Sequence, residues 1–217
     1  MKVRSPTGGK AALTLTELVV VVAIVVLVAG VVLPKFIRSR QLASRTNCAN
    51  QLKSISLGFR IWAEDNNTNG LYPMAVSTNE GGAQEPADAG AVFQVFQLLS
   101  NEICTPKVLV CLSDDRVRST NFWQGFGNSN ISYFLGLDAN ETTPEALLMG
   151  DRNVTGGVRT AENIVTLSDN RLIGWNQEMH NGVGNIALAD GSVKRVNAAE
   201  FQKLLLDSGT TNRLAIP

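Results

Sequence analysis

The chain has 217 residues, 44% of them hydrophobic, and it carries nineteen basic and nineteen acidic side chains, so its formal net charge is zero. A balanced charge gives the whole chain no long-range attraction to nucleic acid or to acidic lipids. The length accommodates one membrane-spanning helix and one globular domain of about 150 residues.

The most apolar stretch is Leu13–Leu33, within which Leu18–Leu33 has neither a charge nor a side-chain hydrogen-bonding group. At about 1.5 Å of helical rise per residue, Leu13–Leu33 spans roughly 31 Å, close to the hydrocarbon thickness of a bilayer. Glu17 lies inside this stretch, where a carboxylate costs about 2.5–3.5 kcal/mol. We therefore expect a transmembrane helix over Leu13–Leu33 in which Glu17 has a charged partner.

The junction that precedes the valine-rich run is Ala12-Leu13-Thr14-Leu15-Thr16-Glu17-Leu18. With residues 8–64 around it, this junction resembles the processing site of type IV prepilins and type II secretion pseudopilins. The resemblance implies that a prepilin peptidase removes the leader, residues 1–12, by cutting between Ala12 and Leu13. It also implies that Leu13 is then methylated and that Glu17 stands fifth in the mature chain. Ala12 replaces the glycine usual in that family, and Leu13 replaces phenylalanine or methionine.

Glu17 and a free amino group at Leu13 would both be poorly solvated beside an apolar helix. In a helical stack, the carboxylate of one subunit can pair with the ammonium of its neighbour, which offsets the desolvation and sets the axial register. The alternative is an ordinary signal anchor in which Glu17 lies at the membrane interface.

Basic residues flank the apolar stretch on both sides, so the positive-inside rule does not choose an orientation. They are Lys2, Arg4 and Lys10 before it and Lys35, Arg38, Arg40 and Arg45 after it. The resemblance implies an inner-membrane protein that spans once, with its amino terminus in the cytoplasm.

Residues 35–64 show the spacing of an amphipathic helix. Apolar residues recur in steps of four, three, four and three at Cys48, Leu52, Ile55, Phe59 and Trp62. This period predicts a helix with one buried face. We expect one helix over residues 13–64, kinked near Pro34, with its second half packed on a globular domain over residues 65–217. Pilins are built in this way.

Asp65 begins a run of turn-forming residues that extends to Gly70 and ends the helix. Asp65, Asn67, Asn69 and Gly70 also match positions one, three, five and six of an EF-hand calcium loop. Position twelve is Val76, where a bidentate glutamate belongs. A plain turn is therefore favoured over a calcium site.

Three segments follow the turn before the central part of the chain. Ser77–Gly90 is poor in hydrophobic residues and predicts a surface loop. Ala91–Ser100 predicts a short helix, and Thr105–Asp114 predicts a short apolar strand that runs into a turn.

The chain has three cysteines, Cys48, Cys104 and Cys111, so one thiol remains if two of them pair. Cys48 with Cys111 would join the helix to the domain, and Cys104 with Cys111 would close only a short loop. We favour the first pairing, because closing a longer loop constrains the unfolded chain more. The chain has no Cys-x-x-Cys and no paired histidines, so we do not expect a metal site.

The second half of the chain predicts antiparallel strands and a final helix, and the whole chain is therefore assigned to the α+β class. The expected strands are Ile131–Leu137, Ala146–Met149, Ile164–Leu167, Gly184–Ala189 and Ser192–Val196. Asp190-Gly191 joins the last two as a hairpin. Ala198–Leu206 predicts a closing helix.

His180, followed after nine residues by Asp190-Gly191, resembles the H-x9-DG motif of a prepilin-like family with the same processed amino terminus. Cys48–Leu57 is similar to that family's Cys-x-Asn-x-Leu-Lys-x-Ile helix. Cys111-Leu112-Ser113-Asp114 is similar to its Cys-Pro-Ser-Asp turn, with Leu112 in place of proline. The resemblance implies a pilin-like fold, in which a long helix packs on a small antiparallel sheet.

His180 is the only histidine, and neither a nucleophile elbow nor a phosphate-binding loop occurs in the chain. We expect no enzymatic activity and no cofactor. Asp190 is expected to accept hydrogen bonds within its turn, and His180 to support the start of the hairpin.

These patterns predict a structural subunit of a type II secretion or type IV pilus-like filament. Its expected partners are copies of itself or other pseudopilins, the prepilin peptidase, the assembly platform and the membrane, and no nucleic acid is indicated. The alternative is a monomeric, signal-anchored protein whose extracytoplasmic domain binds a ligand.

Overall fold

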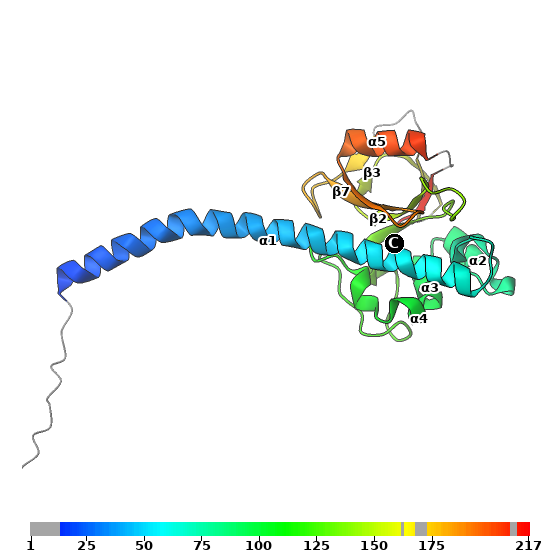
Figure 1. The fold of residues 1–217 in the computed structure, drawn as a ribbon, viewed down its shortest axis with the longest axis horizontal. Helices are drawn as coiled ribbons and strands as arrows, with labels where there is room; N and C mark the ends of the chain where they lie inside the picture. Colours follow the sequence, from blue (N-terminus) through cyan, green and yellow to red (C-terminus); the bar gives the residue numbers. More distant parts are fainter. Residues whose placement is uncertain (1–13, 162, 168–172, 209–211) are drawn as a thin grey trace, which may run out of the picture. The chain divides into compact units, whose positions relative to one another are not determined.

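The computed structural model describes residues 14–161, 163–167, 173–208 and 212–217, and Figure 1 shows their fold. The chain divides into two compact units, Met1–Ala43 and Ser44–Pro217. The boundary between them lies inside helix α1, Leu15–Asp65, which continues through Pro34 without interruption. The second half of the expected helix therefore belongs to the globular unit, and does not form a separate element before it.

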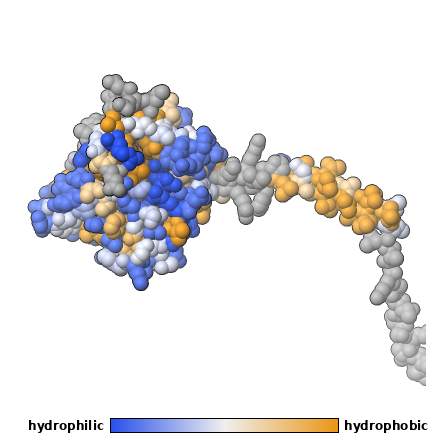
Figure 2. Space-filling model, turned by 180° about the vertical axis from the view of Figure 1, so that it is seen from behind, coloured by the Kyte–Doolittle hydropathy of each residue, from blue (hydrophilic) through white to orange (hydrophobic). Residues whose placement is uncertain are grey.

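In the first unit, α1 is apolar on nearly every side from Leu18 to Leu33. Leu15–Leu33 has a mean hydropathy of 2.9 and is long and apolar enough to cross a membrane. Figure 2 shows this stretch as a nearly continuous hydrophobic surface, whereas the visible face of the globular unit is mostly hydrophilic. None of its side chains is buried within the chain. A helix that is apolar all round needs an apolar environment from outside the chain.

In the second unit, α1 is amphipathic as its spacing predicts. Leu52, Ile55 and Phe59 are fully buried, whereas Leu57, on the opposite face, is 55% exposed. The helix ends at Asp65 in a turn in which Asn67 and Asn69 adopt positive φ angles.

The globular unit contains a seven-stranded antiparallel sheet, and the chain is therefore of the α+β class. The strand order is β4-β5-β9-β1-β2-β7-β8. These strands are β1 Tyr133–Gly136, β2 Leu147–Asp151, β4 Val158–Ala161, β5 Ile164–Thr166, β7 Gly184–Leu188, β8 Val193–Val196 and β9 Arg213–Ala215. Every pairing is antiparallel. Strands β3 (Val154–Thr155) and β6 (Gly174–Trp175) form a second, two-stranded sheet.

Each face of the large sheet packs against helices, as Figure 1 shows. Tyr133 and Leu135 belong to the core that contains Phe59 of α1, and Phe134, which lies between them in sequence, belongs to the core that contains Phe201 of α5. Alternate residues of a strand point to opposite faces, which explains this division. Helix α5, Ala198–Asp207, begins with a capping box in which Asn197 and Glu200 bond to each other's backbone N–H groups.

Helical segments connect α1 to the sheet along one side of the globular unit. They are η1 Pro73–Ala75, η2 Thr78–Glu80, α2 Gln84–Asp88, α3 Val92–Leu98, α4 Ser100–Ile103, η3 Pro106–Leu109 and η4 Asn128–Asn130. The helix expected over Ala91–Ser100 is thus present as α3.

Two predictions for this region are wrong. Ser77–Gly90 was expected to be a surface loop, but it contains η2 and α2, because Glu85 accepts hydrogen bonds from the Ser77 hydroxyl (2.6 Å) and the Thr78 N–H (2.8 Å). Residues 105–114 were expected to begin with a strand, but they begin with the 3-10 helix η3. Thr105 caps η3 by accepting from the Lys107 N–H, and Pro106 stands at its first position. A capping threonine followed by proline is a helix start signal, and here it prevails over the apolar run that follows.

Candidate functional site

The amino terminus of α1 forms the first candidate site. The Thr14 N–H and hydroxyl both donate to Glu17 Oε2, at 2.8 and 2.7 Å, and the Glu17 N–H approaches the Thr14 hydroxyl oxygen at 3.3 Å. This reciprocal arrangement is a capping box, which satisfies N–H groups that the first helical turn leaves unpaired. The expected processing residues, Ala12 and Leu13, lie outside the described residues.

The capping box is compatible with a second partner for Glu17. An ionised carboxylate has about four lone-pair sites, so two bonds from Thr14 leave capacity for a cation. The sequence Thr14-x-x-Glu17 before an apolar run is itself a capping-box signature, which our sequence analysis did not use.

The second candidate site lies in the globular unit, where a disulfide joins Cys48 of α1 to Cys111, two residues after η3. Their Cα atoms are 5.3 Å apart, and 63 positions separate them in the sequence. Both cysteines are buried, and Cys104 is left as an exposed thiol. The disulfide thus attaches the helix to the segment that leads into the sheet.

His180 lies against this disulfide and links it to the sheet. Its Nε2 atom is 3.4 Å from Cys111 Sγ and 3.5 Å from Asp151 Oδ2, at the end of β2. The Asn185 N–H and side-chain amide both donate to the same Asp151 oxygen, at 2.7 and 3.0 Å. Arg45 of α1 donates to the His180 carbonyl at 3.1 Å. His180 therefore contacts α1, the disulfide and the end of β2, the strand that pairs with β7. Sequence analysis expected it to support the start of the hairpin.

Burial controls the charges of this cluster. His180 is 2% exposed and Asp151 is fully buried. Burial, together with the positive charges of Arg45 and Arg195, lowers the pKa of His180 to about 4. Burial raises the pKa of Asp151 to about 7, although the bonds from Asn185 favour its ionised form. Between these two values the protonated carboxyl and the neutral imidazole together carry no net charge, the state that a buried site favours.

Two polar atoms of the cluster have no hydrogen-bond partner among the described residues. They are Asp151 Oδ1 and His180 Nδ1. Buried polar atoms are nearly always bonded, so each exception points to a bound water, an ion or a functional requirement.

The H-x9-DG motif ends in the turn between β7 and β8. Asp190 Oδ1 accepts from the Ser192 N–H at 2.8 Å, as expected for a turn aspartate. Gly191 has a φ of +83°, and its N–H donates to the Leu188 carbonyl. This is a three-residue hairpin loop in which the last position requires the left-handed conformation that glycine adopts without strain.

The Cys111-x-Ser-Asp turn is fastened to the sheet by a charged pair. Both oxygens of Asp114 accept from Arg152, at 2.8 and 2.9 Å. The side chain of Asp114 is 2% exposed and that of Arg152 is 24% exposed. Burial raises the pKa of Asp114, but hydrogen bonds from Arg152 and Ser132 and the charges of Arg152 and Arg116 outweigh it, so the pKa lies below the ordinary value of 3.8.

We expect Asp114→Asn to lower the free energy of unfolding by about 2 kcal/mol at pH 7, because it removes charge-assisted bonds to Arg152. A depressed carboxyl pKa contributes stability above 3.8, and this contribution disappears as the pH falls through the pKa of the folded state. The difference in unfolding free energy between the parent chain and Asp114→Asn should therefore decrease as the pH falls. Urea unfolding at pH 7 and pH 3 measures both effects. The control is Asp115→Asn at the neighbouring exposed position, and an equal loss in both variants would contradict the role of the pair.

The partial calcium-loop pattern at Asp65, Asn67 and Asn69 lies in the turn that ends α1. Asn67 donates its N–H to the Glu64 carbonyl, and the Thr68 N–H donates to the Ala63 carbonyl. The positive φ angles at Asn67, Asn69 and Gly70 are those of a chain reversal. A helix-ending turn accounts for these residues without a metal.

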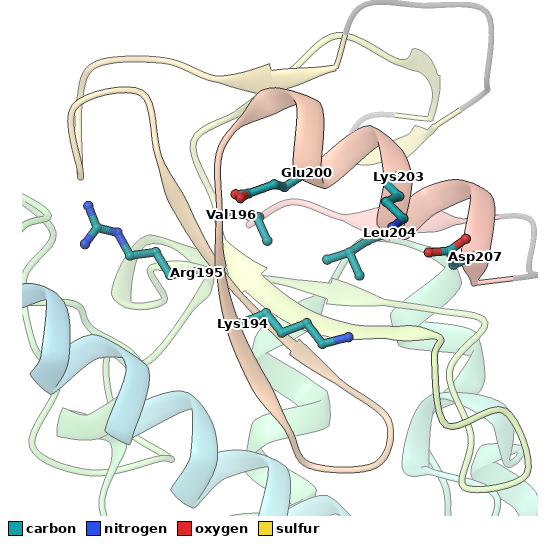
Figure 3. Close-up of a pocket in the computed structure, with 7 residues that line it drawn as sticks. All are labelled: Lys194, Arg195, Val196, Glu200, Lys203, Leu204 and Asp207. Carbon is teal, nitrogen blue, oxygen red and sulfur yellow. The ribbon is translucent and has the colours of Figure 1, made fainter.

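A groove of about 340 Å³ lies between β8 and α5. Figure 3 shows Lys194 and Arg195 on β8, with Glu200, Lys203 and Asp207 on α5, and Arg195 points away from the helix. The side chains carry both signs of charge, and Glu200 also caps α5. This mixture favours neither an anionic nor a cationic ligand.

Asp151 is the principal residue that sequence analysis missed. Only Gly150 separates it from the apolar segment Ala146–Met149. A carboxylate at the end of a buried strand needs a partner. That signal was available, but the partner, His180, is 29 positions away and is reached only through the pairing of β2 with β7.

Comparison of the chain with models of protein families, with curated proteins and with solved structures finds no match.

Proposed function

We propose that this chain is a pilin-like structural subunit of a type II secretion or type IV pilus-like filament. The inner membrane holds it through Leu13–Leu33, with the amino terminus in the cytoplasm. Prepilin peptidase cuts between Ala12 and Leu13, Leu13 is methylated, and the mature subunit is passed by the assembly platform to a filament of its own copies or of other pseudopilins.

One observation carries this proposal: α1 is a single helix of 51 residues with two different surfaces. Its first part is apolar all round and has no buried side chain within the chain. Its second part forms the core of an antiparallel α+β unit. Such a helix suits a subunit that exchanges lipid for neighbouring helices, because helix packing replaces the lipid contacts and the apolar surface never enters water.

Glu17 supplies the register in this proposal. Its carboxylate is held at the first turn of α1 by Thr14. The ammonium of Leu13 in an adjoining subunit is the partner proposed for it, and the pair fixes the axial position of each new subunit.

Three variants separate the capping role of Glu17 from its charge pairing. Each is expressed in cells that contain the peptidase and the assembly platform, and the amount of sedimented filament is measured. Glu17→Gln keeps a capping residue but loses the charge, so assembly should fall at least about tenfold. Glu17→Ala loses both the cap and the charge, so its filament assembly should fall by the same factor. Thr14→Ala loses the cap but keeps the charge, and assembly should continue.

Membrane insertion of all three variants is the control and should be unchanged. Normal assembly of Glu17→Gln would remove the charge-pairing argument.

Processing is tested separately by mass spectrometry of the purified chain. The expected amino terminus is a methylated Leu13. A chain that retains Met1 in the presence of the peptidase would favour the second candidate, a signal-anchored ligand-binding protein, for which the groove between β8 and α5 is a candidate site.

A further inference from the structure

The disulfide, His180 and Asp151 bring together four side chains that are potential metal ligands, with Asp151 in contact with His180. One ligand atom each from Cys48, Cys111 and His180 lies within 4.8 Å of the others. The exposed fractions of Cys48, Cys111, His180 and Asp151 are 0%, 1%, 2% and 0%. The four side chains come from four separate segments of the sequence, and the fold brings them together.

We propose that the dithiol form of the protein binds one Zn²⁺ ion through the thiolates of Cys48 and Cys111, Nε2 of His180 and the carboxylate of Asp151. This proposal concerns the globular unit and is independent of filament assembly.

Two of the distances between proposed ligand atoms are close to those in a tetrahedral zinc site. Zinc bonds of about 2.3 Å to sulfur and about 2.0–2.2 Å to nitrogen and oxygen place neighbouring ligand atoms roughly 3.4–3.8 Å apart. Cys111 Sγ lies 3.4 Å from His180 Nε2, and that nitrogen lies 3.5 Å from Asp151 Oδ2. In the dithiol form, the sulfur atoms of Cys48 and Cys111 are no longer bonded to each other and can move apart to the separation that two zinc ligands require.

The surroundings also suit an ion. Asp151 Oδ1, which has no hydrogen-bond partner among the described residues, offers a second oxygen to a metal. Two thiolates and one carboxylate would leave one negative charge around Zn²⁺. Arg45 and Arg195 are the cations whose charges act on His180, and they would balance it. The soft sulfur donors with imidazole favour zinc over magnesium or calcium.

The metal and the disulfide exclude each other. A newly made chain carries both thiols, and each releases its proton when Zn²⁺ binds. A disulfide oxidant then removes two electrons from the thiolates and takes up two protons to become a dithiol, the Cys48–Cys111 bond forms, and Zn²⁺ leaves. Zinc thus keeps Cys48 and Cys111 together, and away from Cys104, until they are oxidised.

The test uses the full chain in detergent with Cys104→Ser, so that only two thiols remain, kept reduced by a phosphine and titrated with Co²⁺. We expect one Co²⁺ per chain, a thiolate-to-cobalt absorbance in the near ultraviolet, and displacement of the cobalt by one equivalent of Zn²⁺. The same chain with its disulfide formed should bind none.

Two ligand variants and one control sharpen the result. His180→Asn should weaken Co²⁺ binding by about 100-fold, and Asp151→Asn by at least about tenfold. Glu178→Gln, two residues from His180 but 60% exposed at its side chain, should bind as the parent chain does.

Circular dichroism checks folding in each case. A folded, reduced chain that takes up no Co²⁺ would overturn the proposal. So would binding that His180→Asn leaves unchanged, or a reduced chain that stays unfolded when Zn²⁺ is added.

Discussion

Replacing both Cys48 and Cys111 with alanine is expected to lower the free energy of unfolding of the globular unit by about 4 kcal/mol. The disulfide closes a loop of 63 positions. The chain-entropy relation for a loop of that length gives about 4 kcal/mol at 25 °C, which is a large part of the stability of a typical domain. Both residues are also buried, so the variant loses packing as well.

Urea unfolding of the oxidised chain in detergent, with a chelator present, measures this loss. Cys104→Ser is the matched control, because Cys104 is exposed and forms no disulfide, and it should change the unfolding free energy by no more than about 0.5 kcal/mol. A loss below about 1 kcal/mol in the double variant would mean that the disulfide does not constrain the unfolded chain in the way the loop length implies.

Phe59→Ala is expected to lower the free energy of unfolding by about 3–5 kcal/mol, because it leaves a cavity between α1 and the sheet. Phe59 is fully buried and makes edge contacts with Tyr72 and Phe96, with ring centroids 5.7 and 6.1 Å away. Its ring therefore anchors the second half of α1 in the core.

Leu57→Ala is the control on the same helix, two residues away. Leu57 is 55% exposed, so its loss should stay within about 0.5 kcal/mol. Both variants are measured by urea unfolding at pH 7. Equal effects of the two variants would show that this helix face does not form the core of the globular unit.

Local patterns predicted the elements whose signals lie within a few residues of one another. The four-three spacing of Cys48, Leu52, Ile55, Phe59 and Trp62 identified the buried face of α1, and all five are buried. Asp190-Gly191 identified the hairpin of β7 and β8.

Elements that depend on distant partners were missed. Strand β9, Arg213–Ala215, is only three residues long, yet it lies inside the sheet between β5 and β1. Its two neighbours supply its hydrogen bonds, so the short segment carries little strand signal of its own. Strands β3, β4 and β6 were missed in the same way.

The sequence by itself determined that an apolar helix lies near the amino terminus, that this helix continues as an amphipathic one, and that antiparallel strands follow. Helix and hairpin signals repeat over three to seven residues, so they can be recognised without knowledge of the rest of the chain.

Only the tertiary structure decided that His180 meets Asp151 and the Cys48–Cys111 disulfide, at 3.5 and 3.4 Å. These residues come from α1, the end of β2 and two connecting segments, and no local pattern specifies their distances. The packing of α1 on the sheet and the pairing of β2 with β7 bring them together. A buried polar side chain needs a polar partner, and here the partners come from distant segments.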